Sequence, residues 1–142
     1  MLKQVPDVIS PDLMHVLMSM GHGDEICIGD GNFPGATCAK RLVRVNGVDV
    51  VPLLTAIMKF FPLDPYADES AMVMGVVPGD PVVPEIWQDY KRILQEDENF
   101  NGTLGELPRA DFYVRASQAF AVVMTSESAL YANLILKKGV VT

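Results

Sequence analysis

The run Ala71-Met-Val-Met-Gly-Val-Val77 decides the fold class of this 142-residue chain. It is continuously apolar, and the turn sequence Pro78-Gly79-Asp80-Pro81 follows it directly. A strand without polar alternation is typical of a sheet that is covered on both faces, as parallel sheets between helical layers are. The run therefore predicts a central strand of an α/β domain.

Helical periodicity lies on both sides of this run. Apolar residues recur every three to four positions over 50–61 before it and over 84–95 after it. The other predicted elements are helices over 10–20 and 109–119, strands over 25–30, 42–45, 120–124 and 133–136, and a surface loop over 96–107. Because strands and helices alternate, we expect one three-layer α/β/α domain over 1–142 with a mixed, largely parallel sheet.

Composition restricts the function. The net charge is -7 and only 20% of the residues are charged, which argues against a nucleic-acid partner, because such binding depends on clustered Lys and Arg. No apolar stretch is long enough to span a bilayer, and the amino terminus lacks the apolar core of a signal peptide, so we expect a cytoplasmic protein without a membrane partner. Hydrophobic residues make up 49% of the chain, which favours burial between subunits.

The two cysteines suit a cytoplasmic setting. Cys27 and Cys38 are too few for a disulfide framework and form no CxxC pair, so we interpret them as reduced thiols in the core. His15 and His22 are the only other soft ligands, and the sequence therefore predicts no metal site.

The candidate site lies in residues 20–34, Met-Gly-His-Gly-Asp-Glu-Ile-Cys-Ile-Gly-Asp-Gly-Asn-Phe-Pro. His22 stands between two glycines just before the strand predicted over 25–30, and Asp30 stands at the carboxyl end of that strand. In open α/β sheets ligands bind at this end of the strands. A histidine in such a connection also commonly braces a loop by hydrogen-bonding the backbone, and the local sequence leaves both interpretations open.

Three motifs far apart in the chain resemble one known family. They are Gly21-His22-Gly23-Asp24, the run Arg109-Ala-Asp-Phe-Tyr-Val-Arg-Ala116, and Tyr131-Ala132-Asn133 before Leu134-Ile-Leu-Lys-Lys-Gly139. Together they are similar to the sugar mutarotases, which comprise L-fucose mutarotase and D-ribose pyranase. The run from Arg109 resembles the fucose branch, whereas Ala132 resembles the ribose branch.

The resemblance implies a function and a site. It implies an isomerase that interconverts the α and β anomers of L-fucose without a cofactor, in a homo-oligomer, a decameric ring whose pockets are completed across subunit boundaries. Carried over by position, His22 is the proton donor, and the sugar-binding residues are Asp30, Arg109, Tyr131, Ala132 and Asn133. The alternatives are a D-ribose pyranase and a sugar-binding protein without catalysis.

Simpler roles exist for the same side chains. Asp30 could cap a turn, Arg109 could brace the start of a helix, and Tyr131 could pack with its hydroxyl in water. Asp24, two residues after His22, could orient the imidazole, as a carboxylate next to a histidine can fix its tautomer.

Overall fold

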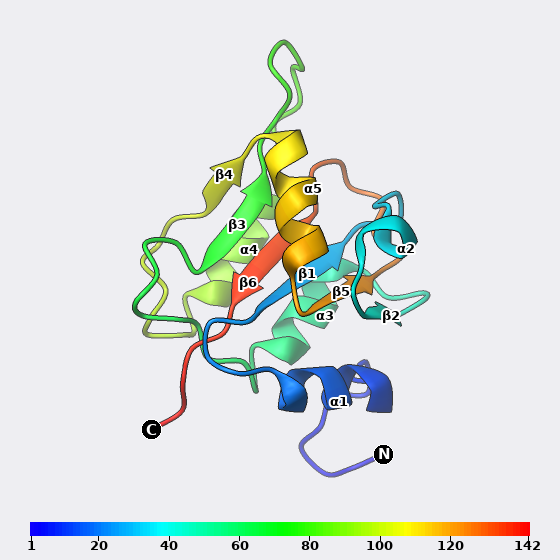
Figure 1. Cartoon of the computed structure of the whole chain (residues 1–142), viewed down its shortest axis with the longest axis vertical. Coiled ribbons are helices and arrows are strands. Elements are labelled where there is room, and N and C mark those ends of the chain that lie inside the picture. The colour runs from blue at the N-terminus through cyan, green and yellow to red at the C-terminus, as the bar shows by residue number, and fades with distance from the viewer.

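Six strands form one sheet in the computed structural model, which describes residues 1–142 (Figure 1). They are β1 (Glu25–Gly29), β2 (Leu42–Arg44), β3 (Ala71–Met74), β4 (Gly105–Leu107), β5 (Ala121–Met124) and β6 (Leu134–Lys137). Their order across the sheet is β2-β5-β1-β6-β3-β4. The run that begins at Ala71 is indeed a fully buried strand, although it ends at Met74.

The sheet is mixed because β6 runs against its neighbours. β1 pairs with β5, β2 with β5, and β3 with β4, all in parallel. β6 pairs antiparallel with β1 on one side and with β3 on the other. The predicted mixed, largely parallel sheet is confirmed. Because β6 is reversed, its amino end lies at the sheet edge where β1, β3 and β5 have their carboxyl ends.

Five helices cover the two faces. They are α1 (Pro11–Ser19), α2 (Gly35–Cys38), α3 (Val50–Ile57), α4 (Ile86–Leu94) and α5 (Arg109–Gln118). The apolar residues of α1, α3 and α4 pack with one face of the sheet, in a cluster that includes Ile26 and Ile28. The other face holds Cys27 and Met72 against Phe112 and Ala116 of α5. Figure 1 shows α5 lying across this second face, with α3 and α4 behind the sheet.

Side-chain alternation along β1 explains the two cores. Ile26 and Ile28 face one way and Cys27 the other, as the two-residue period of a strand requires. Cys27 is completely buried, and this burial raises the pKa of its thiol far above the ordinary value. Its interpretation as a core thiol is therefore confirmed. Cys38 is free as well and only partly buried.

The structure differs from the prediction in short elements. β4 falls inside the segment 96–107 that was predicted to be a loop, and α2 was not predicted. Both are three or four residues long, so neither can display a periodic pattern. The first helix begins as predicted, since the Ser10 hydroxyl accepts a hydrogen bond of 3.1 Å from Leu13 N. None of the helices combines the length and apolar character that crossing a membrane requires.

Candidate functional site

The reversed strand β6 brings the Tyr131–Asn133 segment next to Asp30. Asp30 follows β1, and the Tyr131–Asn133 segment directly precedes β6, so the two lie at the same edge of the sheet. The Asp30 amide donates a hydrogen bond of 2.8 Å to Asn133 Oδ1, although the two residues are 103 positions apart. Asn133 is thereby fixed at the end of β1.

Asp30 is buried, with 8% of its surface exposed. Its Oδ1 accepts a hydrogen bond of 2.9 Å from Asn32 N, so the turn-capping role is part of its function in the fold. Burial and, to a smaller extent, the nearby Glu127 charge raise the pKa of the Asp30 carboxyl. Hydrogen bonds with Asn32 and Asn133 lower this pKa, but they do not offset the effect of burial. Asp30 is thus a partly desolvated carboxylate at the edge where ligands of such sheets bind.

Tyr131 adopts a left-handed backbone conformation with φ +58°. Such a conformation is uncommon for a residue other than glycine and costs about 1 kcal/mol or more unless its surroundings hold it. Two hydrogen bonds hold this segment: the Trp87 indole donates to the Tyr131 carbonyl at 2.8 Å, and the Tyr90 hydroxyl donates to the Ala132 carbonyl at 2.6 Å. Helix α4 therefore fixes the backbone of the segment.

The Tyr131 hydroxyl also has protein partners, in contrast to the alternative of a hydroxyl in water. It donates a hydrogen bond of 2.5 Å to Asp80 Oδ2 and accepts one of 3.3 Å from Val77 N. The hydrogen bond to the carboxylate is the main reason that the pKa of Tyr131 lies above its usual range and the pKa of Asp80 below.

Arg109 completes the group at this edge. It is the first residue of α5, and its Nε donates a hydrogen bond of 3.2 Å to the Tyr113 hydroxyl. Its positive charge acts on the Tyr131 phenol, where it favours the ionised form. We call Asp30, Arg109, Tyr131 and Asn133 the carboxyl-edge cluster. It offers carboxylate and carbonyl acceptors together with guanidinium and amide donors, the groups that bind a polyol.

His22 lies in a second cluster. The loop between α1 and β1 carries it, and Gly23 N in that loop donates a hydrogen bond of 2.8 Å to Lys138 O after β6. His22 Nε2 lies 3.1 Å from Asp64 Oδ1, and the Tyr66 ring is 5.7 Å from the imidazole between centroids. We call His22, Asp64 and Tyr66 the amino-edge cluster.

The carboxylate beside His22 is not the expected one. Asp24 was predicted to orient the imidazole, but its Oδ2 accepts a hydrogen bond of 2.7 Å from Gly21 N and therefore shapes the loop. Asp64 takes the position at His22. Burial raises the pKa of the Asp64 carboxyl, but the hydrogen bonds from His22 and Tyr66 N outweigh it, so the pKa lies below its usual range.

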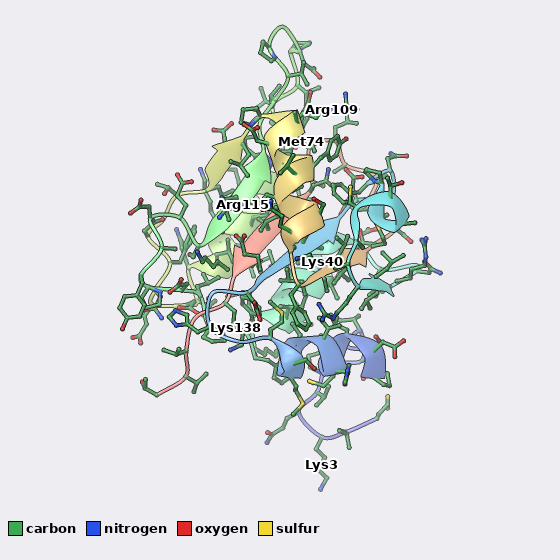
Figure 2. The ribbon with its side chains drawn as sticks, in the orientation of Figure 1. Lys3, Lys40, Met74, Arg109, Arg115 and Lys138 are labelled. Carbon is green, nitrogen blue, oxygen red and sulfur yellow. The ribbon has the colours of Figure 1, made fainter.

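The two clusters lie at opposite edges of the sheet. β1 separates them, since His22 precedes the strand and Asp30 follows it, and a five-residue strand is about 17 Å long. Figure 2 shows the same separation, with Lys138 beside the His22 loop and Arg109 far from it. A single monosaccharide cannot contact His22 and the carboxyl-edge cluster of one chain.

Sequence reasoning missed Asp64 and Asp80. Asp64 lies between the helix predicted over 50–61 and the apolar run, and Asp80 lies in the turn after that run. Both are partners of candidate site residues that are 42 and 51 positions away in the sequence, so local spacing gives no signal for either contact.

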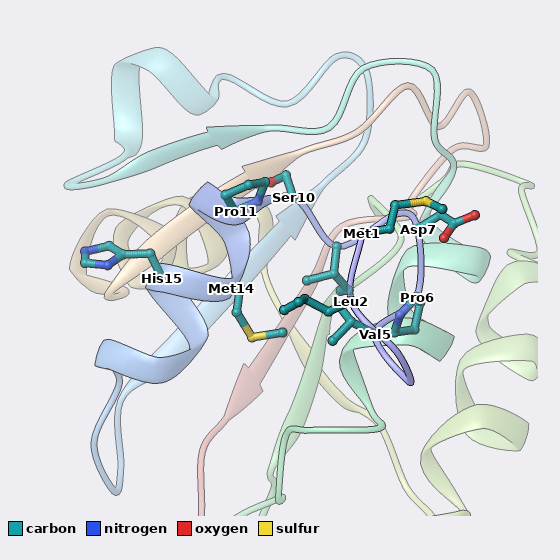
Figure 3. Close-up of a pocket in the computed structure, with 10 residues that line it drawn as sticks. Met1, Leu2, Val5, Pro6, Asp7, Ser10, Pro11, Met14 and His15 are labelled. Atoms are coloured by element: carbon teal, nitrogen blue, oxygen red, sulfur yellow. The ribbon is translucent and has the colours of Figure 1, made fainter.

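Other features of the molecule lie apart from both clusters. A hollow of about 560 Å³ lies beneath the amino-terminal segment, where Met14 of α1 faces Leu2 and Val5 (Figure 3). None of the candidate site residues lines it. No three His, Cys, Asp or Glu side chains gather in a way that could hold a metal ion.

Comparisons with known proteins cover almost the whole chain. The model of the RbsD / FucU transport protein family matches residues 3–141. The fucose mutarotase of Danio rerio is 48% identical over 147 residues, which cover 99% of this chain and 94% of that protein. The L-fucose mutarotase of Haemophilus influenzae is 41% identical, over 99% of this chain and 97% of that protein.

A solved structure extends the similarity to three dimensions. The crystal structure of the fucose mutarotase from Streptococcus pneumoniae in complex with L-fucose matches with a TM-score of 0.95 and 48% identity. The match covers 99% of this chain and 100% of that chain. The strand order and the covering helices described above are therefore those of a solved sugar-bound protein.

Proposed function

The chain belongs to the RbsD / FucU transport protein family, and from this membership we propose that it is an isomerase that interconverts the α and β anomers of L-fucose. Fucose mutarotases that are 48% and 41% identical over nearly the full length support this function. So does the similarity to a fucose mutarotase whose structure contains L-fucose. The resemblance to sugar mutarotases, with the fucose branch favoured, is thereby confirmed.

The chemistry needs two proton movements. The bond between the anomeric carbon and the ring oxygen breaks and then re-forms on the other face of the carbonyl, so the ring oxygen gains a proton while the anomeric hydroxyl loses one. A positioned imidazole changes its protonation near neutral pH and contributes about 100- to 10,000-fold to such steps. We assign the proton donor to His22.

The contact between His22 and Asp64 is the observation that carries this assignment. The imidazole is 45% exposed, so a sugar can reach it, whereas the Asp64 side chain is only 5% exposed. Because Nε2 faces the Asp64 carboxylate at 3.1 Å, Nδ1 is the nitrogen left to meet the sugar. Asp64 acts as a positioning residue, since it accepts the hydrogen bond of Nε2 and so fixes the orientation of the ring.

The carboxyl-edge cluster binds the sugar in this proposal. Asp30 accepts hydrogen bonds from sugar hydroxyls, Arg109 and Asn133 donate, and Tyr131 adds a neutral oxygen and a ring face. Ala132 is completely buried, so its contribution comes through the backbone that Tyr90 holds in place.

The separation of the clusters supports a shared site. Because β1, which is about 17 Å long, lies between His22 and Asp30 within one chain, we propose that the donor of one subunit meets the carboxyl-edge cluster of its neighbour. A repeated contact of this head-to-tail kind closes into a ring, in agreement with the decameric homo-oligomer that the resemblance implies. The free Cys27 and Cys38 suit the cytoplasm, where thiols stay reduced, and we propose that compartment.

The first test is magnetisation exchange between the anomeric protons of equilibrated L-fucose, measured by NMR with catalytic amounts of protein. We expect faster exchange with the wild type and no acceleration with His22→Gln, which should still bind L-fucose through the other cluster. D-ribose is the parallel sample. Binding without acceleration by the wild-type protein would instead indicate a sugar-binding protein.

A mixing experiment tests the shared site. His22→Gln and Arg109→Ala are each expected to be inactive, because each lacks one half of every site. When the two variants are coexpressed, about one quarter of the sites in a ring should combine two intact halves and regain activity. Light scattering should report a homo-oligomer for every variant. The shared site is contradicted if a mixed oligomer regains no activity, or if the protein is a monomer at micromolar concentration.

A further inference from the structure

The loop between β3 and α4 holds the Tyr131 side chain from two sides. Val77 N donates a hydrogen bond to the phenol oxygen at 3.3 Å, and three residues later Asp80 Oδ2 accepts the phenol hydrogen at 2.5 Å. A turn brings these two partners together, since Asp80 N donates to Val77 O at 3.0 Å and Gly79 has a φ of +90°. Figure 1 shows that this loop extends away from the sheet beyond β3.

The loop therefore determines the hydrogen-bonding character of the phenol. A tyrosine hydroxyl has one hydrogen to donate and two lone pairs that accept. The hydrogen is directed to a carboxylate, which is a stronger acceptor than a neutral oxygen. One lone pair faces Val77 N, so the remaining lone pair is what the phenol offers to another molecule.

We propose that Asp80 is a positioning residue that fixes the Tyr131 hydroxyl as a hydrogen-bond acceptor, so that Tyr131 selects a sugar hydroxyl that donates to it. This inference rests on the proposed function, because it deepens the role of Tyr131 in sugar binding. Asp80 itself is engaged on both carboxylate oxygens, since its Oδ1 accepts a hydrogen bond of 3.0 Å from Val82 N. It acts through Tyr131 and does not touch the sugar.

Asp80→Ala removes the acceptor and leaves the phenol free to rotate. We expect KM for L-fucose to rise about tenfold with kcat nearly unchanged, because a hydrogen bond to a charged partner is lost while His22 is untouched. Asp80→Asn keeps an oxygen for Val82 N and for the turn, and it should restore part of the affinity. Glu85→Ala is the matched control. Glu85 lies at the far end of the same loop, just before α4, and its carboxylate makes no capping hydrogen bond to that helix, so KM should be unchanged.

A double-mutant cycle separates action through Tyr131 from damage to the loop. In the Tyr131→Phe background, Asp80→Ala should raise KM no further, because there is no hydroxyl left to orient. Additive losses, or a fall in kcat at constant KM, would overturn the proposal.

NMR of the phenol gives a readout that does not depend on catalysis. With 13Cζ-labelled tyrosine, the signal that disappears in Tyr131→Phe belongs to Tyr131. Its shift should move in Asp80→Ala, and its pKa should fall, because the carboxylate of Asp80 raises the pKa of this phenol. An unchanged signal refutes the role of Asp80. If the Tyr131 signal and its pKa change as expected but the wild-type protein does not accelerate L-fucose exchange, the mutarotase function is refuted instead.

Discussion

Replacing Asp64 by asparagine removes the negative charge beside His22 and preserves the volume of the side chain. The asparagine oxygen can still accept the hydrogen bond of 3.1 Å that Tyr66 N donates to Asp64 Oδ1, so the loop should keep its shape. The variant therefore isolates the electrostatic contribution of Asp64 to the proton transfer by His22.

The size of the effect follows from the exposure of the two partners. Unit charges about 4 Å apart interact with about 1 kcal/mol in water and about 4 kcal/mol at an effective dielectric constant of 20. Because the imidazole is 45% exposed, the lower part of this range applies, although Asp64 is only 5% exposed. If replacing the charged acceptor of Nε2 by a neutral one costs about 1.4 kcal/mol in the positioning of His22, kcat falls tenfold.

The assay is anomer exchange of L-fucose by NMR, with kcat and KM determined separately at one near-neutral pH. We expect kcat to fall about tenfold and KM to change little, because the variant weakens the contact that orients His22 and leaves the carboxyl-edge cluster intact. Asp24→Asn is the matched control, because Asp24 lies in the same loop as His22 but caps Gly21 N. Equal losses in the two variants, or a wild-type kcat in Asp64→Asn, would refute the reasoning.

Three further predictions concern stability. Burial raises the pKa of Asp30, so its ionised form lowers the stability of the folded protein at neutral pH. Asp30→Asn should therefore raise Tm at pH 7, by an amount that shrinks toward pH ~4, and it should abolish fucose binding. A lower Tm at pH 7 would contradict this. The pKa of Asp64 is lowered in the folded protein, so its ionised carboxylate adds to the free energy of unfolding above pH ~4. This contribution is lost as the pH falls through the pKa that Asp64 has in the folded protein. The free energy of unfolding should therefore fall less steeply with acid in Asp64→Asn than in the wild type. Glu127→Ala should cost about 2–4 kcal/mol in urea unfolding, because the Glu127 carboxylate accepts from Val50 N at the start of α3 and from Ala129 N; a loss below about 1 kcal/mol would show that water replaces it.

Sequence reasoning succeeded where a local pattern is long enough to repeat. The apolar run from Ala71 and the amphipathic segments on either side gave the layered fold, because periodicity over several residues reports which faces are covered. It failed for β4, where three residues at the sheet edge carry no period.

The candidate site shows a different limit. His22 and Asp30 could be proposed from one short stretch, but their partners could not, because Asp64 lies 42 residues from His22 in the sequence. Asp24 was the natural choice since it is near in the chain. In the folded protein the Asp24 carboxylate accepts a hydrogen bond from the backbone of the loop. The path of the chain after α3 brings Asp64 to the imidazole instead.

The strands that separate the two clusters are also the central strands of the sheet. β1 lies between β5 and β6, and β6 lies between β1 and β3, so both are hydrogen-bonded on each side. Amides in such strands exchange with solvent only when the whole domain opens, whereas edges and loops open locally. The amides of Cys27, Ile28 and Ile135 should therefore be among the slowest to exchange with deuterium. The spacing between the two half-sites then persists up to global unfolding, and loss of activity on heating should coincide with the melting of the sheet.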